Sequence, residues 1–311
     1  MLLYRTGPGG GESQLAWFDR GGKEIEKVGS TTSLVELALS ADGKRVVSDR
    51  AGPSRRGTDL WISDLEHHGE SKLTLDPSIN GLPVWSPDGS KISFMSNRGG
   101  NQDIYLRAAD GTGQDEPLLQ SKQLKFPYDW SHDGRFIIFE VSAASTGHFA
   151  LPVAGDHKPI PLFETAFFGC CSQLSPDDRW LAYVSSDSGQ GQLYVQPFAP
   201  VATKAVTGKW QISTRGGVLP RWRADGRELF YVEQTGVKLM AVKVKATANS
   251  FNWGTPRHLF DLRFTLNSGR SQYRYAPSPD GQRFLVATDA AATNSDQPLT
   301  MVVNWLAAVK K

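Results

Sequence analysis

The sequence has very little cysteine. Its only two cysteines, Cys170 and Cys171, are adjacent. Neighbouring cysteines rarely bond to each other, and two are too few for the disulfide framework of a small secreted protein. Because free cysteine tends to be buried, we expect an unbonded pair of small residues within a strand.

An excess of charge of either sign is also missing. The chain has 34 Lys and Arg residues against 32 Asp and Glu residues, a net charge of +2 over 311 residues. The basic residues are scattered, with no block of five or more. This balance produces no long-range field that would gather nucleic acid or an anionic membrane. We therefore expect no nucleic-acid partner.

Long apolar runs are absent as well. No stretch approaches the roughly 20 residues that a membrane helix requires. The N-terminal Met1-Leu2-Leu3-Tyr4-Arg5 is too short for a secretory signal. We expect that this chain does not itself insert into a membrane.

One pattern, in contrast, returns six times. A clear copy is Trp85-Ser86-Pro87-Asp88-Gly89, with apolar residues on both sides. Pro presets φ, Asp bonds to nearby backbone amides, and Gly takes the left-handed conformation that ends the turn. Each copy therefore predicts a hairpin, including the fourth, where Asp178 replaces Gly and tolerates that conformation. The aspartates of the six copies, spaced by 46, 45, 44, 48 and 55 residues, are Asp42, Asp88, Asp133, Asp177, Asp225 and Asp280.

Each repeat unit offers two further strands. In the second unit these are residues 103–106 and 117–119, and prolines in such last strands favour an exposed sheet edge. Four antiparallel strands in each unit of about 45 residues indicate an all-β propeller built of four-stranded blades. The tryptophans before the turns, Trp85, Trp130 and Trp222, are expected to pack between neighbouring blades.

We expect one propeller domain over residues 1–311. The N-terminal part predicts three strands ahead of the first full unit, and residues 299–305 supply a third strand to the last unit. Counted separately, these ends give seven blades. Six is the alternative, if the end strands merge into one closing sheet; either closure removes an exposed sheet edge. The seven expected blades cover approximately residues 1–30, 31–77, 78–122, 123–165, 166–215, 216–262 and 263–311.

The second unit resembles the repeat of TolB-type, WD-repeat-like propellers, through residues 85–94 and 96–105. The chain as a whole resembles even more the C-terminal propeller of bacterial receptor-type serine/threonine protein kinases. In that family the propeller follows a kinase domain and a membrane helix, so the resemblance implies an extracytoplasmic or periplasmic sensing or docking module. The stretches that carry it are residues 3–7, 14–20, 195–198, 209–213, 220–231 and 302–305.

No catalytic or cofactor motif is recognisable. The chain lacks the Gly-rich loop, His-Arg-Asp and Asp-Phe-Gly elements of a kinase and the Gly-x-Ser-x-Gly elbow of a hydrolase. It also lacks a sialidase-type Ser-x-Asp-x-Gly-x-Thr-Trp box, and its six histidines have no partner at a metal-like spacing. We expect no catalytic residue, no cofactor and no metal in this chain.

The candidate binding residues lie on loops at one face of the predicted propeller. These loops connect the second strand of a unit to the third, and entry segments to the first strands join them there. Functional residues favour loops on a rigid scaffold. We expect a non-catalytic platform for a protein or peptide. A small-ligand or carbohydrate site, or a propeller hydrolase or lyase, at the channel mouth is the alternative. The candidate partner-binding residues, chosen for charge and aromatic character, are Arg50, Asn97, Arg98, Phe126, Phe168 and Asp187.

Overall fold

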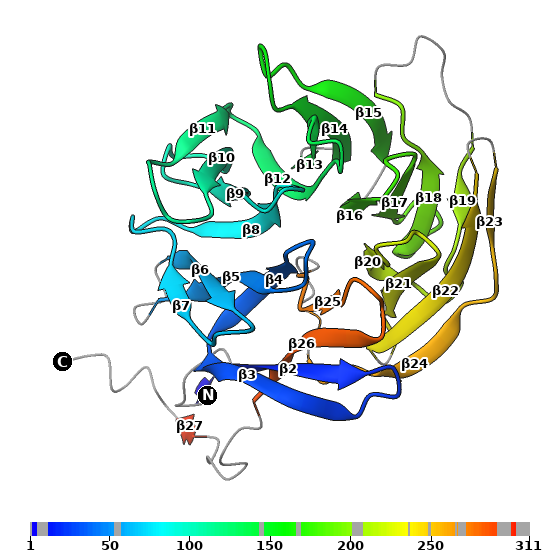
Figure 1. Ribbon diagram of the computed structural model, residues 1–311, viewed down its shortest axis with the longest axis horizontal. Coiled ribbons are helices and arrows are strands. Elements are labelled where there is room, and N and C mark those ends of the chain that lie inside the picture. The colour runs from blue at the N-terminus through cyan, green and yellow to red at the C-terminus, as the bar shows by residue number, and fades with distance from the viewer. Residues whose placement is uncertain are drawn as a thin grey trace.

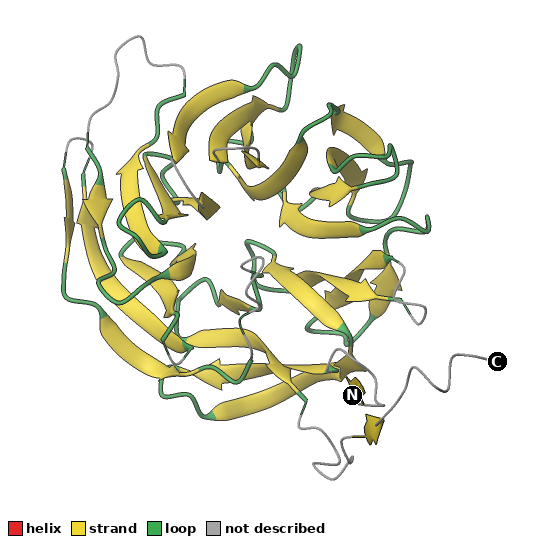
Figure 2. Ribbon diagram, turned by 180° about the vertical axis from the view of Figure 1, so that it is seen from behind, coloured by secondary structure: helices red, strands yellow, loops and turns green. Residues whose placement is uncertain are grey.

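The computed structural model describes residues 2–4, 12–52, 57–142, 146–165, 169–200, 208–235, 237–247, 250–264, 266, 272–290 and 300–302. All the regular structure in these ranges is β-strand (Figure 2). Among the same residues there is no helix long and apolar enough to cross a membrane. The all-β class expected from the turn repeat is confirmed.

Six antiparallel sheets of the described residues stand around a central axis as propeller blades (Figure 1). In four of the sheets the strands follow one another in chain order from the centre outward. A fifth has an extra strand that pairs off this order, and the sixth combines strands from both ends of the chain. Blade 1 holds β4 (Leu34–Leu39), β5 (Arg45–Ala51), β6 (Thr58–Asp64) and β7 (Glu70–Lys72); blade 2 holds β8 (Asn80–Trp85), β9 (Lys91–Ser96), β10 (Asp103–Ala108) and β11 (Glu116–Leu119); blade 3 holds β12 (Leu124–Trp130), β13 (Phe136–Ser142), β14 (Thr146–Pro152) and β15 (Ile160–Thr165).

The second half of the ring continues the pattern, with one longer sheet. Blade 5 has a fifth strand because β22 pairs with β24 along its first half and with β23 along its second. Blade 4 holds β16 (Gly169–Leu174), β17 (Trp180–Ser185), β18 (Gln192–Pro197) and β19 (Trp210–Gln211); blade 5 holds β20 (Val218–Trp222), β21 (Glu228–Glu233), β22 (Lys238–Ala246), β23 (Phe251–Trp253) and β24 (Arg257–Asp261); blade 6 holds β25 (Tyr275–Pro277), β26 (Arg283–Asp289), β2 (Ser13–Asp19) and β3 (Glu24–Thr32).

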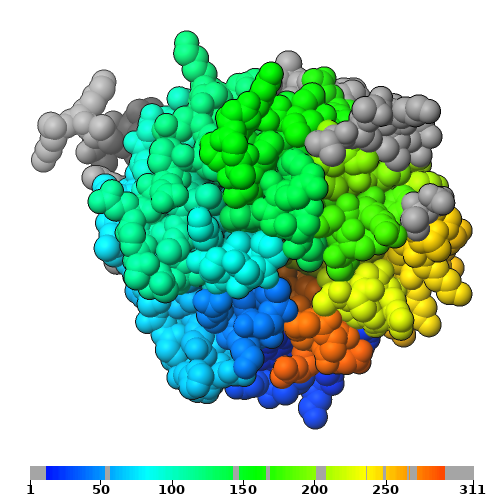
Figure 3. Space-filling view, turned by 45° about the horizontal axis from the view of Figure 1, so that its top comes forward, coloured from blue at the N-terminus to red at the C-terminus, as the bar shows by residue number. Residues whose placement is uncertain are grey.

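The expectation of seven blades is wrong, and six blades are found. The N-terminal β2 pairs with β26, with Leu15 opposite Ala287, so both ends of the chain build one sheet. In the space-filling view the blue N-terminal residues lie against the orange residues of blade 6 (Figure 3). Two separate three-stranded end sheets would leave strand edges unpaired, whereas merging satisfies them. The predicted third strand at 299–305 also differs, since β27 (Thr300–Val302) pairs with β1 (Leu2–Tyr4) instead.

Side chains reinforce the closure of blade 6. The Arg283 guanidinium lies 4.8 Å from the Trp17 ring centroid, which joins β26 to β2 through a cation–π contact. Arg274, which is 7% exposed, pairs with Asp289 at 2.6 Å and donates to the Ser13 hydroxyl at 2.7 Å. The seam between the two ends of the chain is therefore held by charged groups as well as by the strand ladder.

The repeated turns have the predicted chemistry. In the second unit the Ser86 hydroxyl donates to Asp88 at 2.6 Å, and Asp88 accepts the backbone N–H of Ser90. Gly89 has φ +67°, and Asp178 takes φ +54° at the same position of the fourth unit. The left-handed turn therefore survives the replacement of Gly by Asp.

The three named tryptophans pack between neighbouring blades, as expected, and two of them also donate hydrogen bonds across the blades. The Trp85 indole N–H donates to the carbonyl of Ala38 in blade 1, and the Trp222 indole donates to the carbonyl of Gln173 in blade 4. Trp130 packs in a buried cluster with Val84 and Ile104 of blade 2, while its indole donates within its own turn, to Gly134. Packing of these large rings buries apolar surface between blades.

Candidate functional site

The innermost strands are irregular at equivalent positions. Leu82, Cys171 and Leu219 each lie three residues before the last strand residue, and each has a left-handed backbone, with φ of +54°, +64° and +56°. The ladder register shifts at the same points of β8, β16 and β20. Such bulges leave backbone groups without ladder partners.

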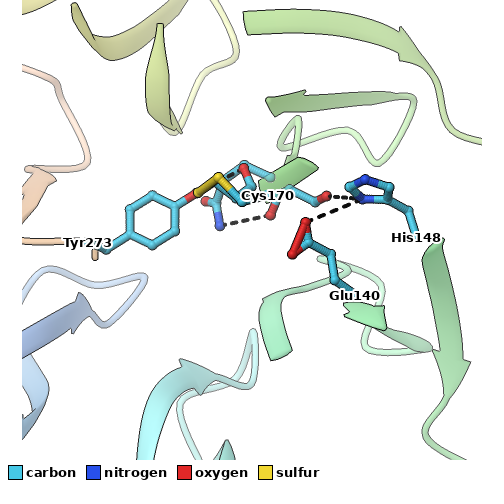
Figure 4. The surroundings of a disulfide bond; sticks show 7 residues. Glu140, His148, Cys170 and Tyr273 are labelled. Carbon is cyan, nitrogen blue, oxygen red and sulfur yellow. Dashed lines mark hydrogen bonds and ion pairs between the residues drawn. A yellow bond between two sulfur atoms is a disulfide. The ribbon is translucent and has the colours of Figure 1, made fainter. Parts of the chain in front are cut away.

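In blade 4 the bulge contains a disulfide bond. Cys170 and Cys171 are bonded to each other, so the expected unbonded pair is wrong, although its place in a buried strand is confirmed. The general rarity of such bonds assumes ordinary extended backbone, whereas the left-handed φ at Cys171 turns the chain out of that geometry. Figure 4 shows this disulfide facing Tyr273, which comes from blade 6, two blades away in the ring.

Two tyrosines of blade 6 satisfy the carbonyls that the bulges set free. The Tyr273 hydroxyl donates to the carbonyl of Cys171 at 3.0 Å, and the Tyr275 hydroxyl donates to that of Leu219 at 2.7 Å. Burial raises the pKa of both phenols, so both stay protonated and can donate. These bonds connect blade 6 to blades 4 and 5 near the axis.

A cavity of about 250 Å3, lined in part by Tyr273, opens at the end of the ring where the repeated turns lie. Its rim is made by one residue from each blade, the one that precedes the turn aspartate. Three of the six are prolines, two are alanines and one is a histidine. The rim residues are Ala41, Pro87, His132, Pro176, Ala224 and Pro279.

The floor of the cavity is divided into two halves. Each blade contributes one floor residue, two places before the serine of its turn; in blade 5 Arg223 replaces that serine. In blades 1, 2 and 6 the floor residues are Ala38, Val84 and Ala276. In blades 3, 4 and 5 the same position holds Asp129, Gln173 and Arg221. The cavity therefore has a half that is apolar apart from the buried Glu36 of blade 1, beside a half with both hydrogen-bond donors and acceptors.

Arg221 is the centre of the polar half. Its guanidinium lies 3.8 Å from the Tyr273 ring centroid and donates to the Gln173 side chain at 3.1 Å. Gln173 in turn donates to the carbonyl of Tyr128 at 2.7 Å. Asp129 accepts the Leu174 N–H at 2.6 Å. Burial raises the pKa of Asp129 to about 6 despite the nearby positive charges of His132 and Arg221.

A buried group next to the disulfide resembles a catalytic set in composition but not in geometry. His148 Nδ1 lies 3.0 Å from the Ser172 hydroxyl and 3.9 Å from a Glu140 oxygen (Figure 4). Both contacts use the same nitrogen, whereas proton relay uses one nitrogen for each partner. All three residues are buried, and burial lowers the pKa of His148 to about 3. The group packs the core of blades 3 and 4.

The two predicted arginines lie in equivalent ion pairs within their blades. Arg50 is 8% exposed, pairs with Glu70 at 2.7 Å and lies over the Trp61 ring. Arg98 pairs with two aspartates, Asp76 and Asp115, and its guanidinium lies 4.7 Å from the Tyr105 ring centroid. These contacts anchor the second-to-third strand loops; a partner-binding role for either arginine stays a prediction.

The other predicted residues are spread around the same face. The Asn97 carboxamide accepts the Ile79 N–H, Phe126 is 5% exposed in a core cluster, and Asp187 pairs with Lys209 at 2.8 Å. Phe168 lies outside the described residues. The structure does not gather these residues into one cavity, and the described cavity lies at the other end of the strands. No group of metal-binding side chains occurs in the described part of the chain.

The rim and floor residues were not predicted, although the repeat alignment contains a signal for them. The rim position was interpreted as part of a tight turn, and the floor position was given no role. The floor position is Ala or Val in three units, but it changes to Asp129, Gln173 and Arg221 in three consecutive units. A polar residue at a position that is otherwise apolar is the signal that marks one side of the channel.

Comparison with known proteins supports the fold. No protein-family model matches the chain. A putative TolB from Agrobacterium tumefaciens aligns with a TM-score of 0.71 and 18% identity, over 91% of this chain and 100% of that chain. TolB from Acinetobacter baumannii aligns with a TM-score of 0.59 and 17% identity, over 83% of this chain and 66% of that one. The chain has the fold of a TolB-type β-propeller. At these identities the likeness shows the fold alone.

A short part of the sequence also matches a curated relative. Dipeptidyl-peptidase 5 of Porphyromonas gingivalis is 36% identical over 73 residues, which is 22% of this chain and 11% of that protein. The chain thus spans a small fraction of this relative's length. The TolB-type resemblance seen in the sequence is confirmed at the level of fold, and the resemblance to kinase-associated propellers stays a prediction.

Proposed function

We propose that the chain is a non-catalytic propeller that docks a peptide or protein segment in the channel-mouth cavity. The observation that carries this proposal is the rim, to which all six blades contribute one residue, around a floor with an apolar and a polar half. The volume, about 250 Å3, is below that of usual small-molecule pockets. It suits one or two residues of a segment that lies on the surrounding face.

The compartment and context of the proposed module follow from two observations. Disulfides persist mainly in oxidising compartments outside the cytoplasm, so the Cys170–Cys171 bond supports an extracytoplasmic or periplasmic location. The resemblance to receptor-type kinase propellers supports a role as the sensor of a longer receptor. We therefore propose an extracytoplasmic sensor module that does not itself catalyse a reaction.

A second candidate is a small-ligand or hydrolytic site in the same cavity. It is favoured by Asp129, whose pKa is raised to about 6, because perturbed carboxylates in cavities mark catalytic sites. Docking is preferred because the serines that line the cavity donate to the aspartates of their own tight turns, which also accept backbone N–H groups, so these pairs form the turns. The serines are Ser40, Ser86 and Ser278.

The test is selection of random linear peptides displayed on phage against the immobilised chain. Ala41, an exposed rim residue, is changed to Arg to fill the mouth, and the exposed Ala154 in the β14–β15 turn is changed to Arg as the control. We expect the chain and Ala154→Arg to enrich the same peptides, and Ala41→Arg to lose them at least tenfold. Failure to enrich any peptide, or equal enrichment on Ala41→Arg, would contradict docking at the mouth.

A further inference from the structure

We propose that the docked segment leaves the channel mouth through a groove between blades 4 and 5, and that this groove selects acidic side chains. The inference rests on the proposed peptide docking. The groove has a volume of about 700 Å3 and is walled by the turns after β16 and β20 and by the second half of β22. Trp180 and Trp222 line it.

The groove and the channel mouth share a boundary. Pro176, Trp222 and Ala224 line both. Pro176 and Ala224 are rim residues of the mouth, so a chain lying over that part of the rim passes directly from one hollow to the other. The shared boundary favours an extended segment as the occupant, because a compact small molecule would fill only one of the two.

The outer wall of the groove comes from a feature found in blade 5 alone among the described blades. The unit is the longest, with 55 residues between its turn aspartate and the next, and the extra length forms the β22–β23 hairpin at the edge of the ring (Figure 1). Insertions in repeat proteins often mark the binding face. Phe251 of this hairpin packs against Trp180, with centroids 5.1 Å apart, and against Trp222.

The hairpin places two lysines in the groove. Lys243 and Lys245 are two residues apart on β22, so their side chains leave the same face of the strand. Both line the groove and are exposed, while Val244 between them is buried. Neither lysine makes an ion pair with any described residue. Their charges are available to a ligand.

The other charges of the groove are largely neutralised by one another. Arg223 pairs with Asp225 at 2.5 Å and with Glu228 at 2.9 Å, and Arg20 from blade 6 also pairs with Glu228 at 2.9 Å. Arg227 has a side chain 79% exposed and lies 3.8 Å from Asp225. In total, three carboxylates, those of Asp177, Asp225 and Glu228, face five cationic side chains, so the groove has a net positive charge. The cations are Arg20, Arg223, Arg227, Lys243 and Lys245.

This surplus of positive charge defines the partner's chemistry. Carboxylate side chains of a peptide would pair with the ammonium groups at the open side of the groove. Exposed pairs of this kind contribute modestly to affinity but select strongly against a like-charged ligand. The occupant we infer is therefore an extended peptide segment that carries Asp or Glu where it leaves the channel mouth.

The test compares peptides selected by three forms of the chain. In the groove variant, Lys243→Glu and Lys245→Glu are combined. In the control, Lys23→Glu and Lys27→Glu are combined, which makes the same charge change on exposed residues at β3 and the turn before it. We expect peptides rich in Asp and Glu from the unmodified chain and the control, and a reversed preference for Lys and Arg from the groove variant. Individual acidic peptides should bind the groove variant at least tenfold more weakly.

The outcomes separate the two proposals. If Ala41→Arg abolishes binding but the selected peptides show no acidic preference, or a preference that the groove variant leaves unchanged, docking at the mouth stands and the groove inference is overturned. If the groove variant abolishes binding and Ala41→Arg does not, the continuous path from the mouth is overturned. If the unmodified chain selects no peptide, both proposals fail. Circular dichroism and thermal melting of each variant confirm that the fold is retained.

Discussion

The hydroxyl of Tyr273 in blade 6 donates a hydrogen bond to the carbonyl of Cys171 in blade 4, two blades away, at 3.0 Å. The bond joins sheets that are not neighbours in the ring (Figure 4). It also joins the disulfide to the cavity, because the Tyr273 ring lies under the Arg221 guanidinium on the cavity floor. The four predictions below test this centre and the buried charges around it.

Tyr273→Phe should lower the free energy of unfolding by about 1–2 kcal/mol. The change keeps the ring under Arg221 but leaves the buried carbonyl of Cys171 without its donor. Urea unfolding followed by fluorescence measures the effect. Tyr275→Phe removes the equivalent bond to Leu219 and should cost a similar amount. A Tyr273→Phe chain as stable as the unmodified one would show that the cross-ring bond contributes nothing.

The disulfide should hold the inner strand of blade 4 in its bulged form. Without reductant the denatured chain should show no free thiol, and after reduction it should show two. Reduction, or the double change Cys170→Ser and Cys171→Ser, should raise amide hydrogen exchange in β16 and around Tyr273, since the left-handed backbone at Cys171 loses its covalent restraint. Two free thiols in the unreduced chain, or unchanged exchange after verified reduction, would reject this role.

Lys125→Met should lower the free energy of unfolding by about 3–5 kcal/mol, because it leaves a buried charge without its partner. Lys125 is 1% exposed, and its ammonium lies 2.6 Å from Asp103 and also donates to the carbonyls of Ser121 and Gln123. Urea unfolding gives the value. The double change Lys125→Met with Asp103→Asn should recover part of the loss. A single variant within 1 kcal/mol of the unmodified chain would be inconsistent with a buried ion pair of this kind.

Asp49→Asn should stabilise the chain at alkaline pH but not at acidic pH. Burial raises the pKa of Asp49 from 3.8 to about 7, so the folded chain binds a proton that the unfolded chain releases. Stability therefore falls as pH rises from about 4, and the loss is complete above about 7. At about 1.4 kcal/mol for each pH unit between the two pKa values, the full loss is on the order of a few kcal/mol.

The measurement for Asp49→Asn is the free energy of unfolding in urea at a series of pH values. The advantage of the variant over the unmodified chain should grow between acidic and neutral pH and then level off. Asp261→Asn, at a carboxylate whose side chain is 70% exposed, is the control and should follow the unmodified chain. A constant difference between Asp49→Asn and the unmodified chain across the series would contradict the raised pKa.

Much of the fold could be predicted from the sequence because its signals are local. The turns around Asp88 and Asp178 follow from conformational preferences of a few adjacent residues, and the tryptophans before the turns follow from periodic burial. The spacing of these turns determined an all-β propeller of four-stranded blades. Sequence pattern alone was sufficient there, since each hairpin is specified within about 20 residues.

The site depends on contacts between distant parts of the chain, which a local sequence pattern does not specify. Six blades rather than seven follow from the pairing of β2 with β26, and the Cys170–Cys171 bond follows from a left-handed backbone inside a bulge. Asp129, Gln173 and Arg221 lie in successive units and meet only because the ring brings the ends of its inner strands to one axis. The sequence determined the repeating unit; closure of the ring decided which of its residues face one another.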